Sequence, residues 1–408
     1  MSKVAMIVWN EFVNDARVLK EAQTLATSNY DVKVFALHTP GKTLQNEVIQ
    51  EKLSVRRIAR SPLWRWRKPT YNAHAREPVQ KNVPEQVHVS ILRLIARTWT
   101  HLGLLVNIIS FRPDVIHAHD VNTLPTAWLA KLLTGAKLVY DAHEISTSRE
   151  GYVQFKKTVA LVEKYLIPRA AAVITTTDTR AKYLARLYKV SRPLTLQNRP
   201  RFVESVKSRI LHEQLGLAEE WPIVLYQGGI QSGRGLEKLV RCAKQFEPCY
   251  VVLIGGGRLT QKLFDIRESL ELQSVVHFIP TVALSELPNY TAAADIAVQP
   301  IENTCFNHFS TDSNKLFEYI IAGVPSVATN FPEIRKIINE HQAGVLIPDN
   351  DDAALVEAVN KLLGDRNLRT SLSKNAKLAA KALSWESQEN LLTGLYQNIL
   401  SDRQDKVA

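Results

Sequence analysis

The feature of this 408-residue chain that most constrains its fold is a regular alternation of short apolar runs with amphipathic stretches. Runs such as Val4–Val8 and Val32–Leu37 are continuous and rich in β-branched residues, as is typical of parallel strands that are buried on both faces. The stretch Ala16–Thr27 between them has the spacing of an amphipathic helix. Because strands alternate with helices and the pattern begins again at Ile223, the sequence predicts an α/β protein with two Rossmann-like domains.

The expected elements are distributed over both halves of the chain. The strands expected in the first half are Val4–Val8, Val32–Leu37, Val115–His119, Leu138–Asp141, Ala172–Thr176 and Leu194–Gln197, and the helices are Ala16–Thr27, Val87–Ile109 and Lys182–Tyr188. The strands expected in the second half are Ile223–Tyr226, Tyr250–Ile254, Val275–Ile279, Asp295–Val298 and Ser326–Ala328, with helices beginning at Leu236, Thr260 and Asn314.

These elements predict four parts of the chain. They are an N-terminal domain (1–200), an interdomain linker (201–221), a C-terminal domain (222–382) and a C-terminal helix (383–408). In open parallel sheets, ligands bind outside the carboxyl ends of the strands. We therefore expect two sheets that face each other across an interdomain cleft, with the chemistry at their strand ends.

Positive charge is concentrated in the N-terminal half. The net charge is +11, and residues 1–200 hold 30 Lys and Arg against 15 Asp and Glu, whereas residues 201–408 hold 21 against 25. The basic segment 60–81 also contains Trp64 and Trp66. Two interpretations are open for it: a solvated loop, or a contact with an anionic membrane surface or a lipid-linked acceptor. No nucleic-acid-binding motif accompanies this segment, so we expect no nucleic acid partner.

The remaining composition favours a cytoplasmic protein. The three cysteines form no CxxC pair, so we expect neither a disulfide framework nor a zinc site. The apolar stretch Ile91–Ile109 contains two arginines and falls short of the ~20 apolar residues of a membrane-spanning helix. The apolar run at the N-terminus is too short for a signal peptide. We expect a cytoplasmic location, with peripheral attachment to the inner face of the cell membrane.

A glycine-rich loop follows the strand expected at Ile223–Tyr226. Gly228 and Gly229 allow a ligand to approach the backbone, and Arg234 can donate to phosphate oxygens just before the next helix begins. The loop matches neither the dinucleotide fingerprint nor the P-loop. A glycine-rich turn without a ligand is the alternative interpretation.

Two charged residues share one face of the helix that begins at Asn314. Lys315 and Glu318 are three positions apart, and Ser313 or Asn314 is a suitable N-cap. The carboxylate can accept hydrogen bonds from both hydroxyls of a ribose, and the lysine can bind phosphate. The alternative is a surface ion pair, which is common at this spacing.

Histidines and carboxylates follow two of the expected strands. His117, His119 and Asp120 end the strand at Val115, and the segment Tyr140–Glu144 ends the next one. Alternation directs His117 and His119 to the same face. A metal site is the alternative to histidines held by structural hydrogen bonds, and because the HxHD spacing has no further ligands beside it, we predict no metal.

In this order and at these spacings, the segments resemble the retaining glycosyltransferases of the GT-B fold, family four (group 1). The resemblance rests on Asn14-Asp15-x-Arg17-Val18-Leu19, Pro113–Asp120, Tyr140–Glu144, the glycine loop, Ile254–Gly257 and Lys315–Tyr319 followed by Ala322–Pro325. It implies that the C-terminal domain binds a nucleotide-diphosphate sugar and the N-terminal domain an acceptor. It also implies that the last helix, from Trp385 to Ile399, crosses back to the N-terminal domain.

The resemblance also implies roles for individual residues. His119 matches the histidine near the transferred sugar, Glu318 the glutamate that holds the ribose, and Arg234 the cation that neutralises the diphosphate. Two positions depart from the family pattern: Ser310 replaces the first glutamate of the Glu-x7-Glu signature, and Gly229 replaces a cation. The predicted catalytic residues are His119, Arg234 and Glu318, and the predicted nucleotide-sugar-binding residues are Asn14, Asp120, Gly228, Gly229, Arg234, Gly256, Ser310, Lys315 and Glu318.

The function implied is metal-independent, retaining transfer of a sugar, by default from a UDP-sugar. The acceptor is expected to be a glycan or a lipid-linked molecule in the synthesis of cell-surface polysaccharide or glycoconjugate, and no cofactor is expected. Family members retain the anomeric configuration by same-face attack, with the protein stabilising the leaving diphosphate. Two alternatives stay open: a nucleotide-sugar 2-epimerase of the same fold, and a non-catalytic member that binds the nucleotide sugar.

Overall fold

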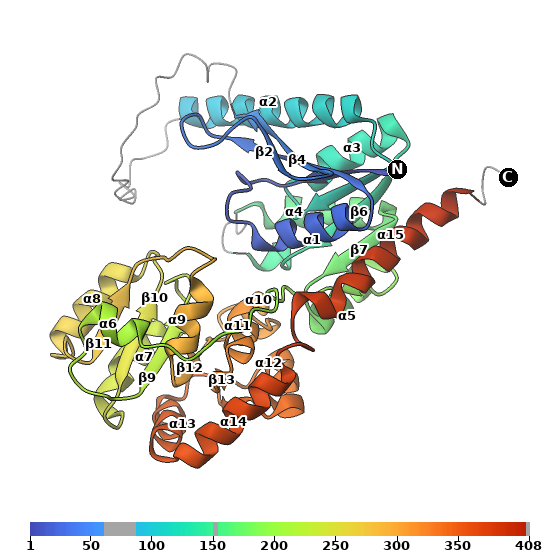
Figure 1. The fold of residues 1–408 in the computed structure, drawn as a ribbon. Coiled ribbons are helices and arrows are strands. Elements are labelled where there is room, and N and C mark those ends of the chain that lie inside the picture. Colours follow the sequence, from blue (N-terminus) through green and yellow to red (C-terminus); the bar gives the residue numbers. More distant parts are fainter. Residues whose placement is uncertain (61–86, 150–153, 405–408) are drawn as a thin grey trace. The chain divides into compact units, whose positions relative to one another are not determined.

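A computed structural model describes residues 1–60, 87–149 and 154–404 of the chain (Figure 1). The described chain divides into two compact units. The first comprises residues 1–176, 181–196 and 389–408, and the second comprises residues 177–180 and 197–388. The basic segment 60–81 lies outside the described residues, apart from Arg60, which is exposed.

The first unit contains an eight-stranded sheet in the order β3-β4-β2-β1-β5-β6-β7-β8. Its strands are β1 (Lys3–Ile7), β2 (Asp31–His38), β3 (Asn46–Gln50), β4 (Leu53–Ala59), β5 (Val115–His119), β6 (Lys137–Ala142), β7 (Ala172–Thr175) and β8 (Leu194–Thr195). All neighbours are parallel except β3, which is antiparallel to β4. Chain order reverses between β1 and β5, so their carboxyl ends form the switch point at which parallel sheets bind ligands.

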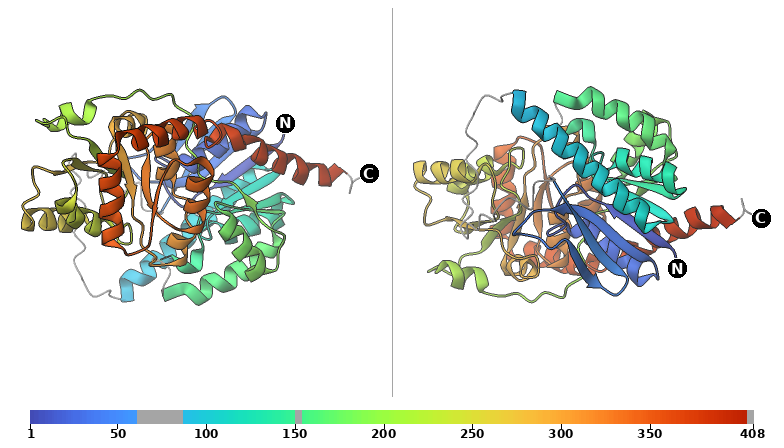
Figure 2. Two further views of the ribbon diagram at one scale, coloured as in Figure 1. Left: turned by 90° about the horizontal axis from the view of Figure 1, so that it is seen from below. Right: turned by 90° about the horizontal axis from the view of Figure 1, so that it is seen from above.

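Six helices belong mainly to the first unit: α1 (Ala16–Thr27), α2 (Val87–Phe111), α3 (Leu124–Thr134), α4 (Lys156–Leu166), α5 (Asp178–Tyr188) and α15 (Glu389–Gln404). Helix α1 begins where Asp15 accepts a hydrogen bond from the backbone N–H of Val18. Helix α2 lies against β4 and beside α3 (Figure 2), with Gly103 packed on Ile58. Its stretch Leu94–Phe111 is long and apolar enough to cross a membrane by length and composition alone, the one such helix among the described residues.

The C-terminal helix α15 belongs to the first unit. Glu389, at its start, accepts a hydrogen bond from Thr24 of α1 at 2.8 Å. Tyr396, in its middle, is fully buried and its hydroxyl is 2.8 Å from His117 Nδ1. The end of the chain therefore completes the core beneath β1 and β5.

The second unit contains a six-stranded parallel sheet in the order β11-β10-β9-β12-β13-β14. Its strands are β9 (Ile223–Gln227), β10 (Tyr250–Ile254), β11 (Val276–Ile279), β12 (Ile296–Gln299), β13 (Ser326–Thr329) and β14 (Gly344–Ile347). Its helices are α6 (Ile210–Leu215), α7 (Leu236–Cys242), α8 (Thr260–Ser269), α9 (Leu287–Ala293), α10 (Phe306–Phe309), α11 (Asn314–Ile321), α12 (Pro332–His341), α13 (Asp352–Gly364) and α14 (Arg366–Ala379). Here chain order reverses between β9 and β12. The prediction of two α/β domains with parallel sheets is confirmed.

The segment 201–221 differs from the sequence-based expectation of a linker. It lies within the second unit and contains helix α6. Leu211 of this helix is fully buried in a core cluster with Ile223 and Tyr250. Its polar composition reflects the exposed face of a short helix, and the apolar face packs on the sheet.

Candidate functional site

In the second unit, the loops that follow β9 and β10 touch each other through glycines. Gly228 has φ +118° and Gly255 has φ +140°, conformations that L side chains rarely adopt. A Cβ on Gly255 would lie 2.1 Å from the Gly228 carbonyl oxygen. The predicted glycine loop is therefore held against the loop that contains Gly256, at the switch point of this sheet.

Lys315 of α11 lies over this glycine loop. A Cβ on Gly228 would be 2.4 Å from Lys315 Cε, and Lys315 Nζ is 5.6 Å from the centre of the Tyr226 ring. Burial and the nearby Arg234 lower the pKa of Lys315 to about 8. A buried lysine whose protonation is opposed by a neighbouring cation is suited to binding an anion. Helix α7 starts beside Arg234 but is only seven residues long, so its dipole is weak. The side chains of Lys315 and Arg234 therefore supply most of the attraction for an anion.

Glu318 is oriented by the last residue of β9. Its Oε2 accepts a hydrogen bond from Gln227 Nε2 at 2.6 Å. Gln227 is fixed in turn, because its Oε1 accepts from the Thr291 hydroxyl at 2.7 Å and its backbone N–H donates to the Tyr319 hydroxyl. Among the described residues, Gln227 is the one hydrogen-bond partner of the Glu318 carboxylate, so its second oxygen remains for a ligand. Lys315 and Glu318 form no ion pair with each other, which argues against the surface-pair interpretation.

The turn that precedes α11 is strained and tightly packed. Ser313, the N-cap, has φ +52° and ψ +126°, and its side chain makes no cap hydrogen bond. Strained residues of this kind concentrate at functional sites. The hydroxyl of Ser310 donates to the Phe306 carbonyl at 2.7 Å and accepts from Arg180 Nε at 3.0 Å. Ser310, at the position where the resemblance leads us to expect a glutamate, is fully buried and is thus engaged by protein partners.

In the first unit, a buried cluster of charged side chains lies at the carboxyl ends of β5 and β6. Arg17 of α1 donates to both carboxylate oxygens of Asp141, at 2.9 and 3.0 Å, and its Nε is 3.1 Å from Glu21. Burial alone would raise the pKa of Asp141, but Arg17 and His143 hold that pKa well below its usual range. Burial also raises the pKa of Glu21, against the opposing charge of Arg17. The cluster therefore contains a buried ion pair between Arg17 and Asp141.

Three histidines surround this ion pair and differ in protonation. The rings of His117 and His119 stack at 4.3 Å, which confirms that the two residues share a face. Burial lowers the pKa of both, so they are neutral near pH 7. Burial would also lower the pKa of His143, but Asp141 and Asp120 raise it to about 9. His143 is thus the charged member, and its side chain is 21% exposed.

His119 is held from one side only. Its Nδ1 lies 3.1 Å from His143 Nε2 and 3.4 Å from Asp141 Oδ2. Its Nε2 has no hydrogen-bond partner in the part of the chain that the structure describes, although the side chain is nearly fully buried. This arrangement fixes the ring and leaves one nitrogen for a hydroxyl group.

The same cluster has the donor set of a metal site. One donor atom from each of Glu21, His117, His119 and Asp141 lies within 4.8 Å of the others. However, the guanidinium of Arg17 contacts both carboxylates, and His143 adds a second positive charge. A divalent cation would have to displace these groups, so the side chains fit an internally neutralised cluster better than a metal ion.

The raised pKa of His143 predicts that the stability of the first unit falls at alkaline pH. A histidine with a folded-state pKa of about 9 and an unfolded value of 6.5 stabilises the fold fully below pH 6.5, and this contribution is lost as the pH rises through 9. At ~1.36 kcal/mol per pKa unit, the contribution is about 3 kcal/mol. Denaturant unfolding at pH 6 and pH 9.5 should show that the wild type loses about 3 kcal/mol more than His143→Gln. His341→Gln is the control, and equal losses in all three proteins would contradict the assignment.

The other predicted residues lie at the same strand ends. Asp120 follows β5 with φ +62°, and its carboxylate is 3.3 Å from Arg149. Asn14 is exposed beside the cap of α1, and Gly229 is near the start of the glycine loop. Sequence reasoning missed Gln227 and Asp141 as organisers of the two clusters, although each is a polar residue at the end of an apolar strand.

Comparisons with known proteins match both units. The model of the glycosyl transferases group 1 family matches residues 207–379, and that of the glycosyl transferase 4-like domain matches residues 15–197. D-inositol 3-phosphate glycosyltransferase of Saccharomonospora viridis is 23% identical over 311 residues, which cover 71% of this chain and 70% of that protein. The corresponding protein of Salinispora arenicola is 25% identical over 312 residues, covering 69% and 68%.

Solved structures show the same fold. Sucrose-phosphate synthase from Thermosynechococcus elongatus superposes with a TM-score of 0.80 at 18% identity, covering 98% of this chain and all of that one. HepE from Anabaena, solved in complex with UDP-glucose, superposes with a TM-score of 0.72 at 16% identity, covering 99% of this chain and all of that one.

Proposed function

Since this chain belongs to the group 1 glycosyl transferases and has their GT-B fold, we propose that it transfers a sugar from a UDP-sugar to a glycan or lipid-linked acceptor in the synthesis of cell-surface glycoconjugates. The observation that carries this proposal is the pairing of Lys315 and Arg234 with the oriented Glu318 at the switch point of the second sheet. The cations suit the diphosphate, and the free carboxylate oxygen suits the ribose. The UDP-glucose bound to HepE supports uracil as the base.

We propose further that transfer retains the anomeric configuration and needs no metal. The acceptor oxygen forms its bond to the anomeric carbon on the face from which the diphosphate leaves. The bond between that carbon and the phosphate oxygen breaks, and the proton of the acceptor passes to the departing oxygen. Lys315 and Arg234 stabilise the negative charge that develops on the diphosphate, which is the task a metal ion performs elsewhere.

The test is a thermal-shift panel of nucleotide-diphosphate sugars, followed by transfer and hydrolysis assays on the sugars that bind, with and without EDTA. We expect a UDP-sugar to stabilise the protein, the released or transferred sugar to keep the α configuration of the donor by NMR, and EDTA to leave the rate unchanged. An inverted product or loss of activity in EDTA would contradict the proposed mechanism. Conversion of the donor to its 2-epimer without acceptor would identify an epimerase instead.

We expect His119→Ala to lower kcat by about a hundredfold or more while the affinity for UDP stays within twofold. The reason is that the ring of His119 is fixed for a hydroxyl group, whereas Lys315 and Glu318 of the other unit hold the nucleotide. The measurements are steady-state kinetics and calorimetric UDP binding, with His341→Ala as the control. An unchanged kcat would make His119 a structural residue.

Gly229→Arg is expected to tighten UDP binding about two- to fivefold. Gly229 has no positive φ, and a Cβ there would meet only Gln231 Cγ at 3.6 Å, so a side chain fits at this position. The new cation would join Arg234 and Lys315, at the position where the resemblance leads us to expect a cation. Gly364→Arg, at another position with room for a side chain, is the matched control. Unchanged or weaker UDP binding in the Gly229 variant would place the diphosphate elsewhere.

A further inference from the structure

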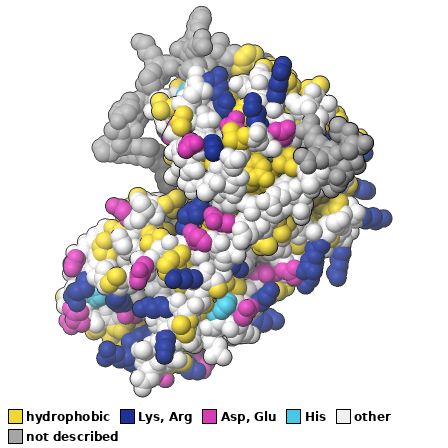
Figure 3. Space-filling view, turned by 45° about the vertical axis from the view of Figure 1, so that its right-hand side comes forward, with side chains coloured by type: hydrophobic (Ala, Val, Ile, Leu, Met, Phe, Trp, Pro, Cys, Tyr) yellow, Lys and Arg dark blue, Asp and Glu magenta, His cyan; other side chains and the backbone are white. Residues whose placement is uncertain are grey.

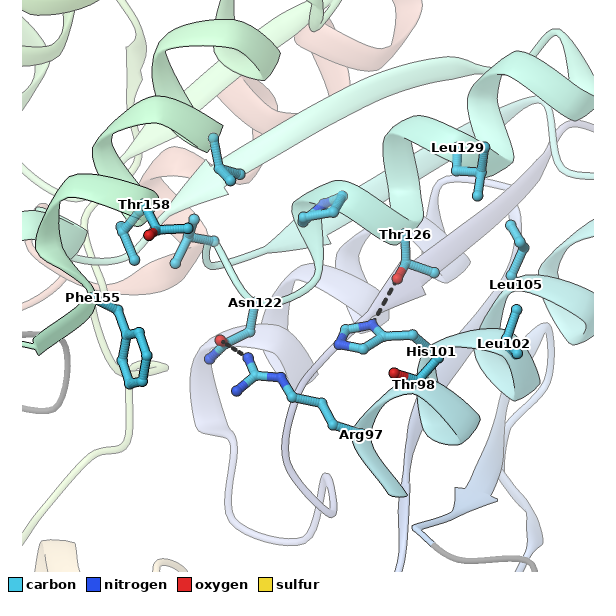
Figure 4. A pocket seen from close by; sticks show the side chains of 14 residues that line it. Arg97, Thr98, His101, Leu102, Leu105, Asn122, Thr126, Leu129, Phe155 and Thr158 are labelled. Atoms are coloured by element: carbon cyan, nitrogen blue, oxygen red, sulfur yellow. Dashed lines mark hydrogen bonds between the residues drawn. The ribbon is translucent and has the colours of Figure 1, made fainter. Parts of the chain in front are cut away.

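Helices α2, α3 and α4 of the first unit surround an apolar pocket of about 480 Å³. Leu102 and Leu105 of α2, Leu129 of α3 and Val162 of α4 line it, and Phe155 lies across from Leu102 and Leu105 (Figure 4). Its volume is in the range of small-molecule sites. Val121 and Asn122 also line it, directly after the carboxyl end of β5, so the pocket adjoins the edge that carries His119.

The polar groups in the pocket wall are already satisfied or neutral. Arg97 donates to Asn122 at 2.8 Å, and His101 Nδ1 is 2.7 Å from the Thr126 hydroxyl (Figure 4). Burial and the nearby Arg97 lower the pKa of His101 to about 4, so this ring is uncharged at neutral pH. The interior of the pocket therefore suits an apolar group, with one cation at its wall.

Helix α2 extends the apolar surface beyond the pocket. Leu94, Ile95, Trp99, Leu102 and Val106 are each between 48% and 65% exposed. At 3.6 residues per turn they occupy one arc of about 140°, which shares Leu102 with the pocket-lining residues. Thr100, Leu104 and Ile108 mark the buried side of the helix, which is narrow, and only 17% of the stretch Leu94–Phe111 is inside the protein.

Helices α3 and α4 continue this surface. Leu129 and Leu133 are four positions apart on α3 and are 40% and 59% exposed. Leu161 and Tyr165 have the same spacing on α4 and are 67% and 51% exposed. We call the exposed apolar residues of α2, α3 and α4, with Phe155, the α2–α4 face. Contiguous apolar surface of this kind on a folded domain marks an interaction site.

The charge that α2, α3 and α4 expose in the described residues is positive. The one acidic residue in the three helices is Glu163, which is 1% exposed and accepts hydrogen bonds from Tyr140, Ser146 and Tyr188. Lys157 and Lys164 of α4 are exposed beside Leu161. Over the second unit, acidic and basic side chains are mixed on the face drawn in Figure 3.

We propose that the α2–α4 face docks on the surface of a bilayer that contains anionic lipid, with one lipid chain in the pocket. Apolar side chains enter the acyl boundary, Trp99 and Tyr165 lie at headgroup depth, and the lysines meet lipid phosphates. A second copy of the chain is a poor occupant, because pairing two such faces would bring their cations together. Docking of this kind rests on the proposed function, because it places the acceptor at a lipid surface. Lipid binding is measured without sugar transfer, so the docking proposal and the proposed function can fail separately.

The first experiment measures cosedimentation of the full chain with vesicles of phosphatidylglycerol or of phosphatidylcholine. We expect binding to the anionic vesicles that weakens at high salt. Leu133→Asp with Leu161→Asp should lower the partition coefficient about a hundredfold or more, because both leucines lose their burial in lipid. Lys157→Gln with Lys164→Gln should lower it about thirtyfold, at ~1 kcal/mol per cation. Leu284→Asp with Leu378→Asp, at exposed leucines of the second unit, is the matched control and should bind like the wild type.

The second experiment reports contact directly. Lipids with brominated chains should quench tryptophan fluorescence in the wild type, and the quenching should fall in Trp99→Phe, whose binding is otherwise retained. Unaltered melting temperatures of the variants would show that they are folded. Three results would overturn the inference. The first is vesicle binding that survives in both α2–α4 double variants, and the second is binding that is abolished instead by neutralising Arg65, Arg67 and Lys68. The third is equal binding of both kinds of vesicle by all proteins.

Discussion

Glu318→Ala should weaken the binding of UDP and UDP-sugars about tenfold to a hundredfold, because hydrogen bonds to a carboxylate contribute ~1.5–3 kcal/mol. Gln227 holds one carboxylate oxygen at 2.6 Å, so the group is preorganised and the other oxygen can accept from ribose hydroxyls. The loss should appear in the dissociation constant measured by calorimetry, with the melting temperature of the free protein nearly unchanged.

Two further variants sharpen this test. Glu318→Gln keeps the shape and an acceptor oxygen but removes the charge, so we expect a smaller loss than with alanine. Glu357→Ala removes an exposed carboxylate from α13 of the same unit and should bind UDP like the wild type. If the Glu318 and Glu357 variants bind UDP equally well, the ribose does not lie at α11.

Asp141→Asn is expected to have the largest effect on stability. The carboxylate accepts two hydrogen bonds from Arg17 and is 3.1 Å from the charged His143, all with Asp141 fully buried. Removing one partner of a buried ion pair leaves the other charges uncompensated and costs about 3–5 kcal/mol. For a unit of this size, the thermal transition should fall by about 6 to 20 °C.

The second unit provides an internal control for this variant. The residues that we propose bind the nucleotide belong to the second unit, whereas Asp141 belongs to the first, so UDP affinity should be unchanged at temperatures where the first unit is folded. Glu51→Gln, which removes an exposed carboxylate of the first unit, should leave the transition in place. A loss of less than about 1 kcal/mol in Asp141→Asn would mean that Arg17 finds other partners and that the cluster is not a tight ion pair.

The sequence by itself determined the sheets. The bounds predicted for Val115–His119, Tyr250–Ile254 and Ala16–Thr27 agree with β5, β10 and α1, because a strand buried on both faces must be continuously apolar and a covering helix must have one apolar face. Three strands were not predicted: β3 at the edge of the first sheet, its neighbour β4, and β14 at the edge of the second sheet. The sequences of β3 and β4 mix polar and apolar residues, and β14 is an apolar run of only four residues.

The local motifs also determined where chemistry gathers. Lys315, Glu318, Arg234 and the glycine loop come together at the switch point of the second sheet, because the carboxyl ends of parallel strands share one edge. His117 and His119 share a face because successive side chains of a strand point to opposite faces.

Only the tertiary structure decided how these groups are held. Gln227 meets Glu318 across 91 residues of chain, and Arg17 meets Asp141 across 124. Tyr396 reaches His117 across 279 residues, once α15 packs in the first unit. The pKa of each group depends on its burial and on charges that only folding brings near. The difference between a neutral His119 and a charged His143 is therefore a property of the folded cluster, and the local sequence spacing does not encode it.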